Sequence, residues 1–193
     1  HTNLDFLRGI KNLRELTLHK CYQLENLDSL HYLPNLEKVS LPDSVDLENI
    51  EGLSTLSKLT HLELPFCHGL TNFDFMVNLK NLTNLHISNY KYELDVSVLC
   101  ELPNLTSLLL PCLRELRPWQ QQALGKLTNL TSLSLGYKAY SDLADSNEDY
   151  FEPQSYGYLL DLSFVRGLTN LMYLDLGGHE DLTNVEALKK KKN

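Results

Sequence analysis

Three side chains in this 193-residue chain have the clearest potential for chemistry: His61, Glu63 and His86. Imidazole and carboxylate groups that meet in a fold can bind a metal ion or take part in acid-base catalysis. His61 and Glu63 are two residues apart, so their side chains lie on the same face of an extended strand. His86 follows Glu63 by 23 residues. The three groups therefore meet only if segments 23 residues apart lie side by side.

The chain repeats with that same spacing. A leucine preceded by Asn or Lys opens each unit; five units begin 23 residues apart, the sixth follows after 25 residues and the seventh after 41. The opening leucines are Leu13, Leu36, Leu59, Leu82, Leu105, Leu130 and Leu171. Leucine makes up 45 of the 193 residues, which indicates that one core environment recurs along the chain. A regular repeat of this length predicts a solenoid of stacked units.

Each unit changes its period halfway along. Apolar residues at positions 1, 4 and 6, as in Leu13, Leu16 and Leu18, predict a half-buried strand. Apolar residues then recur every third residue, which is the period of a 3₁₀ helix, so we expect short 3₁₀ or irregular return limbs. Residues 118–124 differ because Pro118 is placed to open a helix and good helix formers follow it. We expect an α-helix there.

The outward positions of the strands define the candidate site. Positions 3 and 5 of each unit point away from the core, and stacking arranges them in two columns on the concave face of a parallel sheet. The first column reads Glu15, Lys38, His61, Asn84, Ser107, Ser132 and Tyr173, and the second reads Thr17, Ser40, Glu63, His86, Leu109, Ser134 and Asp175. We predict that a partner binds to Glu15, Lys38, His61, Glu63, Asn84, His86, Leu109, Ser134, Tyr173 and Asp175.

These repeats resemble those of the leucine-rich-repeat proteins. The run Leu-Thr-Asn-Leu-Thr-Ser-Leu-Ser-Leu at 127–135 is especially similar to the short repeats of bacterial internalins and related intracellular regulatory proteins. The resemblance implies an α/β solenoid, an arc with a parallel concave β-sheet and a convex side of mostly 3₁₀ and irregular segments. The sequence departs from the family at position 9, where Cys21, Ser44 and Cys67 replace the usual Asn.

The repeats indicate a single domain that covers residues 1–193. It contains a partial repeat at 1–11, seven repeats from 12 to 188, and an insertion at about 137–155. Because the first residues match the second half of a unit, and no cap-like segment is visible at either end, we expect the chain to be a fragment of a longer protein with neighbouring domains. The resemblance implies that any catalysis lies in those domains.

The insertion combines acidic and aromatic residues. It carries five acids, one base and four aromatic side chains. Tyr140, Tyr150 and Phe151 are of types enriched at the centres of interfaces, and the surrounding carboxylates attract basic surfaces. We predict an arm at the rim of the concave face that contacts a protein partner with a basic surface. The alternative is a disordered acidic loop.

Composition excludes several classes of function. A net charge of −8 argues against nucleic-acid binding, and no apolar run approaches the roughly 18 residues that a membrane helix needs. Cys21 and Cys67 lie two units apart, about 10 Å, so they cannot form a disulfide, and no CxxC pair suggests zinc. With Cys100 and Cys112, we expect four free thiols and no metal or cofactor. Free thiols favour the cytoplasm of a bacterium, or the host cytosol for an effector.

The sequence thus predicts a protein-protein interaction module with no catalytic residues. We expect the recognition domain of a larger intracellular protein or of a secreted bacterial effector, which binds through its concave face and insertion. One alternative is an enzyme or a metal-dependent activity centred on His61, Glu63 and His86. The other is a purely structural scaffold, whose partners would map only to the convex side.

Overall fold

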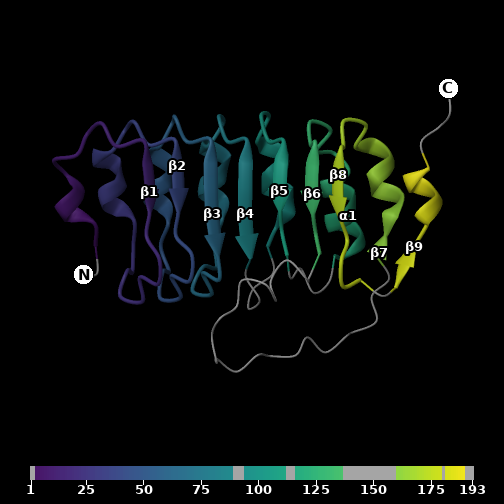
Figure 1. Ribbon diagram of the computed structural model, residues 1–193, viewed down its shortest axis with the longest axis horizontal. Helices are drawn as coiled ribbons and strands as arrows, with labels where there is room; N and C mark the ends of the chain where they lie inside the picture. The colour runs from purple at the N-terminus through teal and green to yellow at the C-terminus, as the bar shows by residue number, and fades with distance from the viewer. Residues whose placement is uncertain (1–2, 89–93, 112–115, 137–159, 180, 190–193) are drawn as a thin grey trace.

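The computed structural model describes residues 3–88, 94–111, 116–136, 160–179 and 181–189. Its main feature is a parallel sheet of seven short strands that lie side by side along the long axis of the molecule (Figure 1). In order across the sheet these are β1 (Glu15–Thr17), β2 (Lys38–Ser40), β3 (His61–Pro65), β4 (Asn84–Ser88), β5 (Ser107–Leu109), β6 (Ser132–Ser134) and β8 (Tyr173–Asp175). Each strand comes from one repeat, so the predicted stacking of units is confirmed.

The return limbs stack behind the sheet, mostly as 3₁₀ helices (Figure 1). They are η1 (Asp5–Leu7), η2 (Asp28–Tyr32), η3 (Glu51–Thr55), η4 (Asp74–Asn78), η5 (Val96–Glu101), η7 (Leu162–Gly167) and η8 (Val185–Leu188). Period-three leucines favour them, because this helix brings every third side chain to one face. The α-helix expected at 118–124 is confirmed as α1 (Pro118–Leu124), with proline in the first turn.

One continuous apolar core fills the space between the sheet and the return limbs. In β3, Leu62 and Leu64 are fully buried while Glu63 between them is exposed. Burial of one such leucine stabilises the fold by roughly 1.5–3 kcal/mol, so a shift of the strand by one residue would be strongly unfavourable. The repeated burial of alternate residues therefore determines which side chains the sheet presents to solvent.

Side-chain hydrogen bonds tie neighbouring units together near the start of each strand. Asn81 Nδ2 donates to the carbonyl oxygen of Ser57 at 2.7 Å. Thr83 Oγ1 donates to the carbonyl oxygen of Thr60 at 3.0 Å. The asparagine bond recurs at Asn35, Asn104, Asn129 and Asn170, and the threonine bond at Thr60, Thr106 and Thr131. The repeated Asn-Leu-Thr sequence is therefore explained by the stacking of the units.

A second pair of parallel strands, which was not predicted from the sequence, forms on the return limbs. β7 (Leu160–Asp161) pairs with β9 (Leu182–Thr183), and a single bridge joins Asn26 to Asn49 in earlier units. In each case the chain runs extended just before a 3₁₀ helix, which leaves its backbone groups free to pair with the next unit. Two-residue segments have no periodicity that distinguishes them from loops.

Three consecutive units turn through a residue in the left-handed region after their strands. Lys20, Asp43 and Phe66 have φ angles of 53°, 58° and 60°. The conformation costs roughly 1–2 kcal/mol for a residue with a Cβ. It is held in place by backbone hydrogen bonds to the next unit, such as the one from Lys20 N to the carbonyl oxygen of Pro42 at 3.0 Å.

The predicted insertion at 137–155 falls outside the described residues, and Gly136 is the last described residue before it. Tyr140, Tyr150 and Phe151 of the predicted arm are among the residues outside, as is Cys112. Within the described part of the chain, no helix has the length and apolar character that crossing a membrane requires.

Candidate functional site

The strand register confirms the two outward columns. In the first column, Glu15 lies opposite Lys38, which lies opposite His61, and the column continues through Asn84, Ser107, Ser132 and Tyr173. The second column runs through Thr17, Ser40, Glu63, His86, Leu109, Ser134 and Asp175. Neighbours within a column are separated by about 4.8 Å, the spacing between strands.

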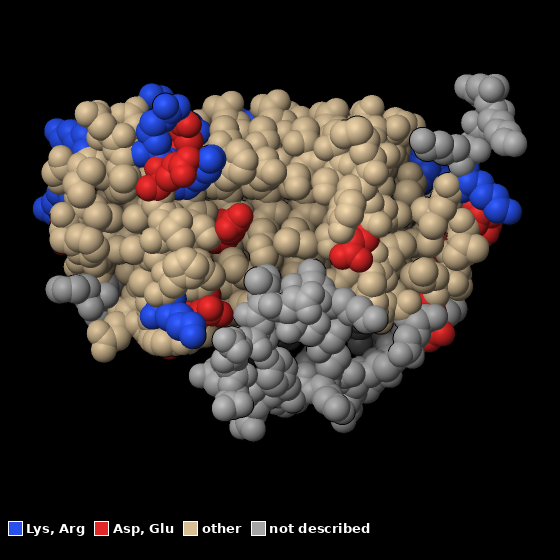
Figure 2. Space-filling model, in the orientation of Figure 1, with Lys and Arg blue, Asp and Glu red and all other residues tan. Residues whose placement is uncertain are grey.

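Charge is unevenly distributed over this face of the sheet. Figure 2 shows lysine, arginine and acidic side chains gathered over the first strands, whereas only isolated acids interrupt the uncharged surface over the later ones. Ser107, Leu109 and Ser132 are half-buried in that uncharged part. The uncharged centre of the face is therefore accessible at these three residues, whereas the predicted site residue Ser134 beside them is buried.

The charges over the first strands pair with one another. Lys38 Nζ lies 2.8 Å from Glu15 Oε1, and Arg14 Nη2 lies 2.6 Å from Glu37 Oε1. The hydrogen bond from Lys38 lowers the pKa of the Glu15 carboxyl, and the bond to Glu37 raises the pKa of Arg14. Such exposed pairs contribute little to stability, but they leave this end of the face close to electrically neutral.

Two carboxylates further along the second column have no cationic partner among the described residues. Glu63 Oε2 accepts a hydrogen bond from Ser40 Oγ at 2.8 Å. Asp175 Oδ2 accepts one from Ser134 Oγ at 2.9 Å, and its Oδ1 accepts one from the backbone N–H of Gly177 at 2.9 Å. These bonds orient both groups without neutralising them. Among the described residues, the face therefore carries two negative charges without a cationic partner, four strands apart or about 19 Å.

His61, Glu63 and His86 lie on adjacent strands, as their spacing predicts, but they are not joined into one reactive group. His61 Nδ1 is hydrogen-bonded to Thr60 Oγ1 at 2.8 Å, and Glu63 is bonded to Ser40. Nε2 of His86 is buried and has no hydrogen-bond partner among the described residues. Among the residues that the structure describes, no three His, Cys, Asp or Glu side chains gather as metal ligands would.

One exposed apolar residue beside the first column was not predicted from the sequence. Met172 is 85 % exposed, and the neighbouring Tyr173 is 56 % exposed. Four earlier units place a threonine where Met172 stands, and each of those threonines bonds to the preceding unit. A methionine cannot form that bond. The break in the threonine pattern was the signal in the sequence that could have identified this position.

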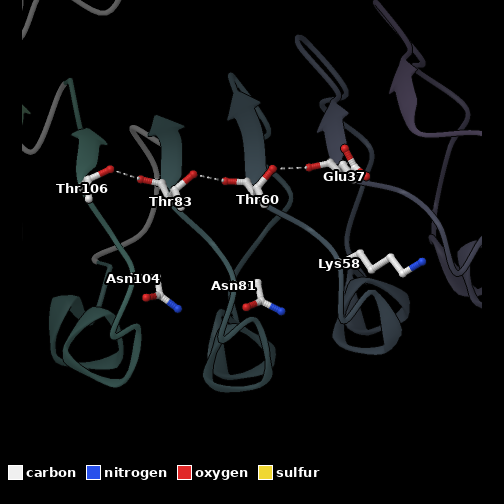
Figure 3. Close-up of a pocket in the computed structure, with 7 residues that line it drawn as sticks. All are labelled: Glu37, Lys58, Thr60, Asn81, Thr83, Asn104 and Thr106. Atoms are coloured by element: carbon white, nitrogen blue, oxygen red, sulfur yellow. Dashed lines mark hydrogen bonds between the residues drawn. The ribbon is translucent and has the colours of Figure 1, made fainter.

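An open groove runs beside the columns, at the start of the strands (Figure 3). Its volume is about 580 Å³, and it is lined by Glu37, Lys58, Thr60, Asn81, Thr83, Asn104 and Thr106. One amide N–H of each Asn and the hydroxyl of each Thr in its lining are used in the bonds between units. The groove is therefore lined by polar side chains that these bonds hold in place, and it is too open to exclude water from a reaction.

The thiols differ more in exposure than the sequence suggests. The described cysteines, Cys21, Cys67 and Cys100, are all free. Cys67 is buried, its Sγ lies 3.2 Å from the carbonyl oxygen of Leu41, and burial raises its pKa to about 12. Cys100, by contrast, is exposed. It lies on η5, on the outer side of the solenoid, rather than in the bend after a strand.

Comparison with known proteins rests on structure alone. No protein-family model matches the chain, and no curated protein matches it in sequence. The leucine-rich repeat domain of the type III effector XopL is similar, with a TM-score of 0.64 and 19 % identity over 97 % of this chain and 70 % of that one. This likeness and the parallel sheet with its 3₁₀ return limbs show that the protein is a leucine-rich-repeat solenoid.

Two internalins from Listeria monocytogenes are also similar in structure. The internalin InlF has a TM-score of 0.44 and 17 % identity, and the match covers 91 % of this chain. Internalin C2 has a TM-score of 0.41 and 16 % identity, over 88 % of this chain and 82 % of that one. The chain spans 58 % of the length of InlF.

Proposed function

We propose that the protein is a protein-protein interaction module that binds its partner on the concave face of the sheet. The observation that carries the proposal is the pair of uncompensated carboxylates, Glu63 and Asp175, with the uncharged surface around Leu109 between them. A carboxylate that is oriented but not neutralised is suited to an incoming cation. The uncharged stretch between the two, with Leu109 in its middle, is suited to the centre of an interface.

This arrangement specifies the chemistry of the partner. The partner that fits this face presents two basic groups about 19 Å apart with an apolar side chain between them. Tyr173 and Met172, both exposed beside Asp175, supply the large amphipathic and flexible contact area that interfaces favour. The predicted arm at 137–155 supplies further acidic and aromatic contacts in this proposal.

The remaining parts of the proposal concern the setting of the module. We propose that it is the recognition domain of a larger intracellular protein or of a secreted effector. The free thiols of Cys21, Cys67 and Cys100 support action in a reducing compartment such as the cytoplasm. The neighbouring domains would carry any catalysis, because the open sheet provides no enclosed site for it.

The enzyme alternative receives less support from the geometry. His61 and His86 make no hydrogen bond to each other or to Glu63 among the described residues, and both lie on an open surface. The scaffold alternative predicts partner contacts on the return limbs only, which an experiment can separate from concave binding.

Site-specific photo-crosslinking tests the proposal. Benzoylphenylalanine is placed at Ser107, in the concave face, or at Val77, an exposed residue of η4 on the return limbs. We expect protein adducts from Ser107 in an extract of the source organism, and fewer of the same adducts from Val77. Adducts from Val77 alone would contradict concave binding and favour the scaffold.

Charge reversal supplies the matched control. Glu63→Lys should abolish most of the Ser107 adducts, because it replaces an uncompensated negative charge on the face with a positive one. Glu48→Lys makes the same change at an exposed position of a return limb and should leave the adducts unchanged. Both variants should melt within about 2 °C of the wild type, because surface substitutions usually change stability by less than about 0.5 kcal/mol. Equal losses in both variants would indicate a general charge effect rather than a site.

A further inference from the structure

Tyr173 places an accessible aromatic ring at one end of the concave face. It is the one tyrosine, tryptophan or phenylalanine in the two outward columns, and its side chain is 56 % exposed. Its register partner on β6 is Ser132, whose small side chain covers little of the ring. β8 is the last strand of the seven-stranded sheet, so no described strand flanks the ring on the other side. Within the described residues, the ring is therefore open to a partner.

Asp175 follows Tyr173 by two residues on the same strand, so both side chains point to the same face, about 6.6 Å apart along the strand. Figure 2 shows acidic atoms at the surface over the later strands, and Asp175 is the one acid that the columns have there. Its carboxylate accepts one hydrogen bond on each oxygen, from Ser134 Oγ and from the backbone N–H of Gly177. An ionised carboxylate has about four lone-pair sites, so two of them remain for a ligand.

The main chain of Gly136 holds this carboxylate in one place. A Cβ atom at Gly136 would lie 2.6 Å from both Oδ1 and Oδ2 of Asp175, so the carboxylate fills the space that a side chain at this position would need. Together with the bonds from Ser134 and Gly177, this contact fixes the orientation of the group before any partner arrives. A group that is already ordered loses little conformational freedom on binding, which favours affinity.

The other carboxylate without a cationic partner on this face lacks the aromatic neighbour. The residues beside Glu63 in the columns are Ser40, His61 and His86, and none of them is a tyrosine, tryptophan or phenylalanine. Among the described residues, the combination of an exposed aromatic ring and an oriented, unpaired carboxylate therefore occurs at β8 and not at β3.

We propose that Tyr173 and Asp175 together receive one arginine side chain of the protein partner. The guanidinium group is planar and always charged, so it can stack on the tyrosine ring while its N–H groups donate to the carboxylate. It is also less strongly hydrated than an ammonium group, which favours it in a partly covered position. The inference rests on the proposed function, because it assumes that a protein occupies the concave face.

The site should select arginine by both charge and shape. Lysine can pair with Asp175, but its compact and strongly hydrated ammonium group neither stacks on a ring as a plane nor donates to two oxygens in a fixed geometry. Citrulline has nearly the same planar shape as arginine and carries no charge. It therefore loses both the cation–π attraction and the charge-assisted hydrogen bonds.

Nuclear magnetic resonance with small probes tests the proposal without knowledge of the partner. The ring proton signals of Tyr173 are assigned by their loss in Tyr173→Leu, and N-acetylarginine methylamide is titrated into the wild-type protein. We expect a saturable shift of these signals, weaker binding of the lysine analogue and no saturable shift with the citrulline analogue. The amide signal of Gly177, whose N–H donates to Asp175, reports binding in variants that lack the tyrosine.

Variants separate the contributions of the ring, the charge and the orientation of the carboxylate. Asp175→Asn should weaken binding of the arginine probe about tenfold, because it removes the charge. Tyr173→Leu should weaken it about two- to fivefold, whereas Tyr173→Phe keeps an aromatic face and should bind like the wild type. Gly136→Ala should also weaken binding, because the new Cβ displaces the carboxylate while the net charge stays the same.

Glu63→Gln is the matched control, because it removes a carboxylate that also lacks a cationic partner but lies about 19 Å from Asp175. It should leave the shift of the Tyr173 signals unchanged, and a loss equal to that of Asp175→Asn would indicate a general charge effect and reject the site. The absence of a saturable shift at the highest soluble concentration of the arginine probe would overturn the proposal. So would equal binding of the arginine and citrulline probes, or unchanged affinity in Tyr173→Leu. Should Asp175→Asn fail to fold, Tyr173→Leu and Gly136→Ala decide.

The outcome is separable from that of the proposed function. Concave crosslinks without arginine binding at Tyr173 would retain the interaction surface and reject the arginine site. Arginine binding without concave crosslinks would retain the local site and reject concave recognition of a protein.

Discussion

Replacing Gly52 with alanine should destabilise the solenoid by forcing two neighbouring units apart. Gly52 lies in η3, and a Cβ atom there would lie 2.1 Å from the carbonyl oxygen of Leu27 and 2.5 Å from its carbonyl carbon. Both atoms belong to the backbone of the preceding unit, so no side-chain rotation can relieve the contact. Ordinary contact begins near 3.4 Å, so the two limbs would have to separate by about 1 Å.

The expected loss follows from the packing of η2 against η3. Overpacking of a well-packed region typically costs about 1–3 kcal/mol, and a clash with backbone atoms places this variant in the upper part of that range. A loss of about 2–3 kcal/mol corresponds to a fall in Tm of roughly 4–12 °C for a chain of this size. Differential scanning calorimetry measures the fall, and urea unfolding measures the change in free energy.

Gly9→Ala is the matched control for the same chemical change. No atom lies within 4 Å of the position that its Cβ would occupy. We expect the free energy of unfolding of this variant to stay within about 0.5 kcal/mol of the wild type. A wild-type Tm for Gly52→Ala would show that the limbs tolerate the added Cβ. An equal loss of stability in both variants would attribute the loss to helix or loop propensity instead of the clash.

Four further changes test other parts of the structure. Leu62→Ala should cost roughly 2–5 kcal/mol in urea unfolding because Leu62 is fully buried, and a loss below 1 kcal/mol would mean that the core readily collapses around the cavity. Lys20→Gly should raise stability by roughly 1 kcal/mol because its φ of 53° is strained for lysine, and a lower Tm would show that the side chain contributes more than the strain costs. Burial lowers the pKa of His86 below 6.5, so on acidification below about pH 6.5 the unfolded chain takes up a proton more readily than the folded chain, and stability should fall. Thermal melts of His86→Phe should show a smaller fall in stability over this pH range. A pH profile identical to that of the wild type would rule out this residue as a cause. The pKa of about 12 leaves Cys67 with a thiolate fraction roughly a thousandfold smaller than that of an ordinary thiol. Iodoacetamide should therefore label the exposed Cys100 in the native protein and Cys67 only after unfolding, as measured by mass spectrometry. Labelling of Cys67 before Cys100 in the native protein would contradict this prediction.

Much of the architecture followed from the period of the leucines. A 23-residue step with apolar residues at positions 1, 4 and 6 leaves only one register in which Leu62, Leu85 and their equivalents share a core. Because the side chains of a strand alternate, that register also determines which residues face outward. The two columns of the candidate surface could therefore be written down from the sequence.

The interactions made by those columns were decided by the tertiary structure. The pairing of Lys38 with Glu15, the unneutralised state of Glu63 and the burial of Nε2 in His86 depend on side-chain rotamers and on neighbours 23 residues away. Sequence spacing assigns a residue to a face, but it does not determine which of several neighbouring groups its side chain reaches.

The return limbs show the same division. Period-three leucines predicted the 3₁₀ helices, because each buried leucine is a strong local constraint that repeats in every unit. The pairing of β7 with β9 and the contact that excludes a Cβ at Gly52 were not predictable, because they depend on how closely two limbs approach. That approach is determined by the packing of the whole core between sheet and limbs, which no single repeat encodes.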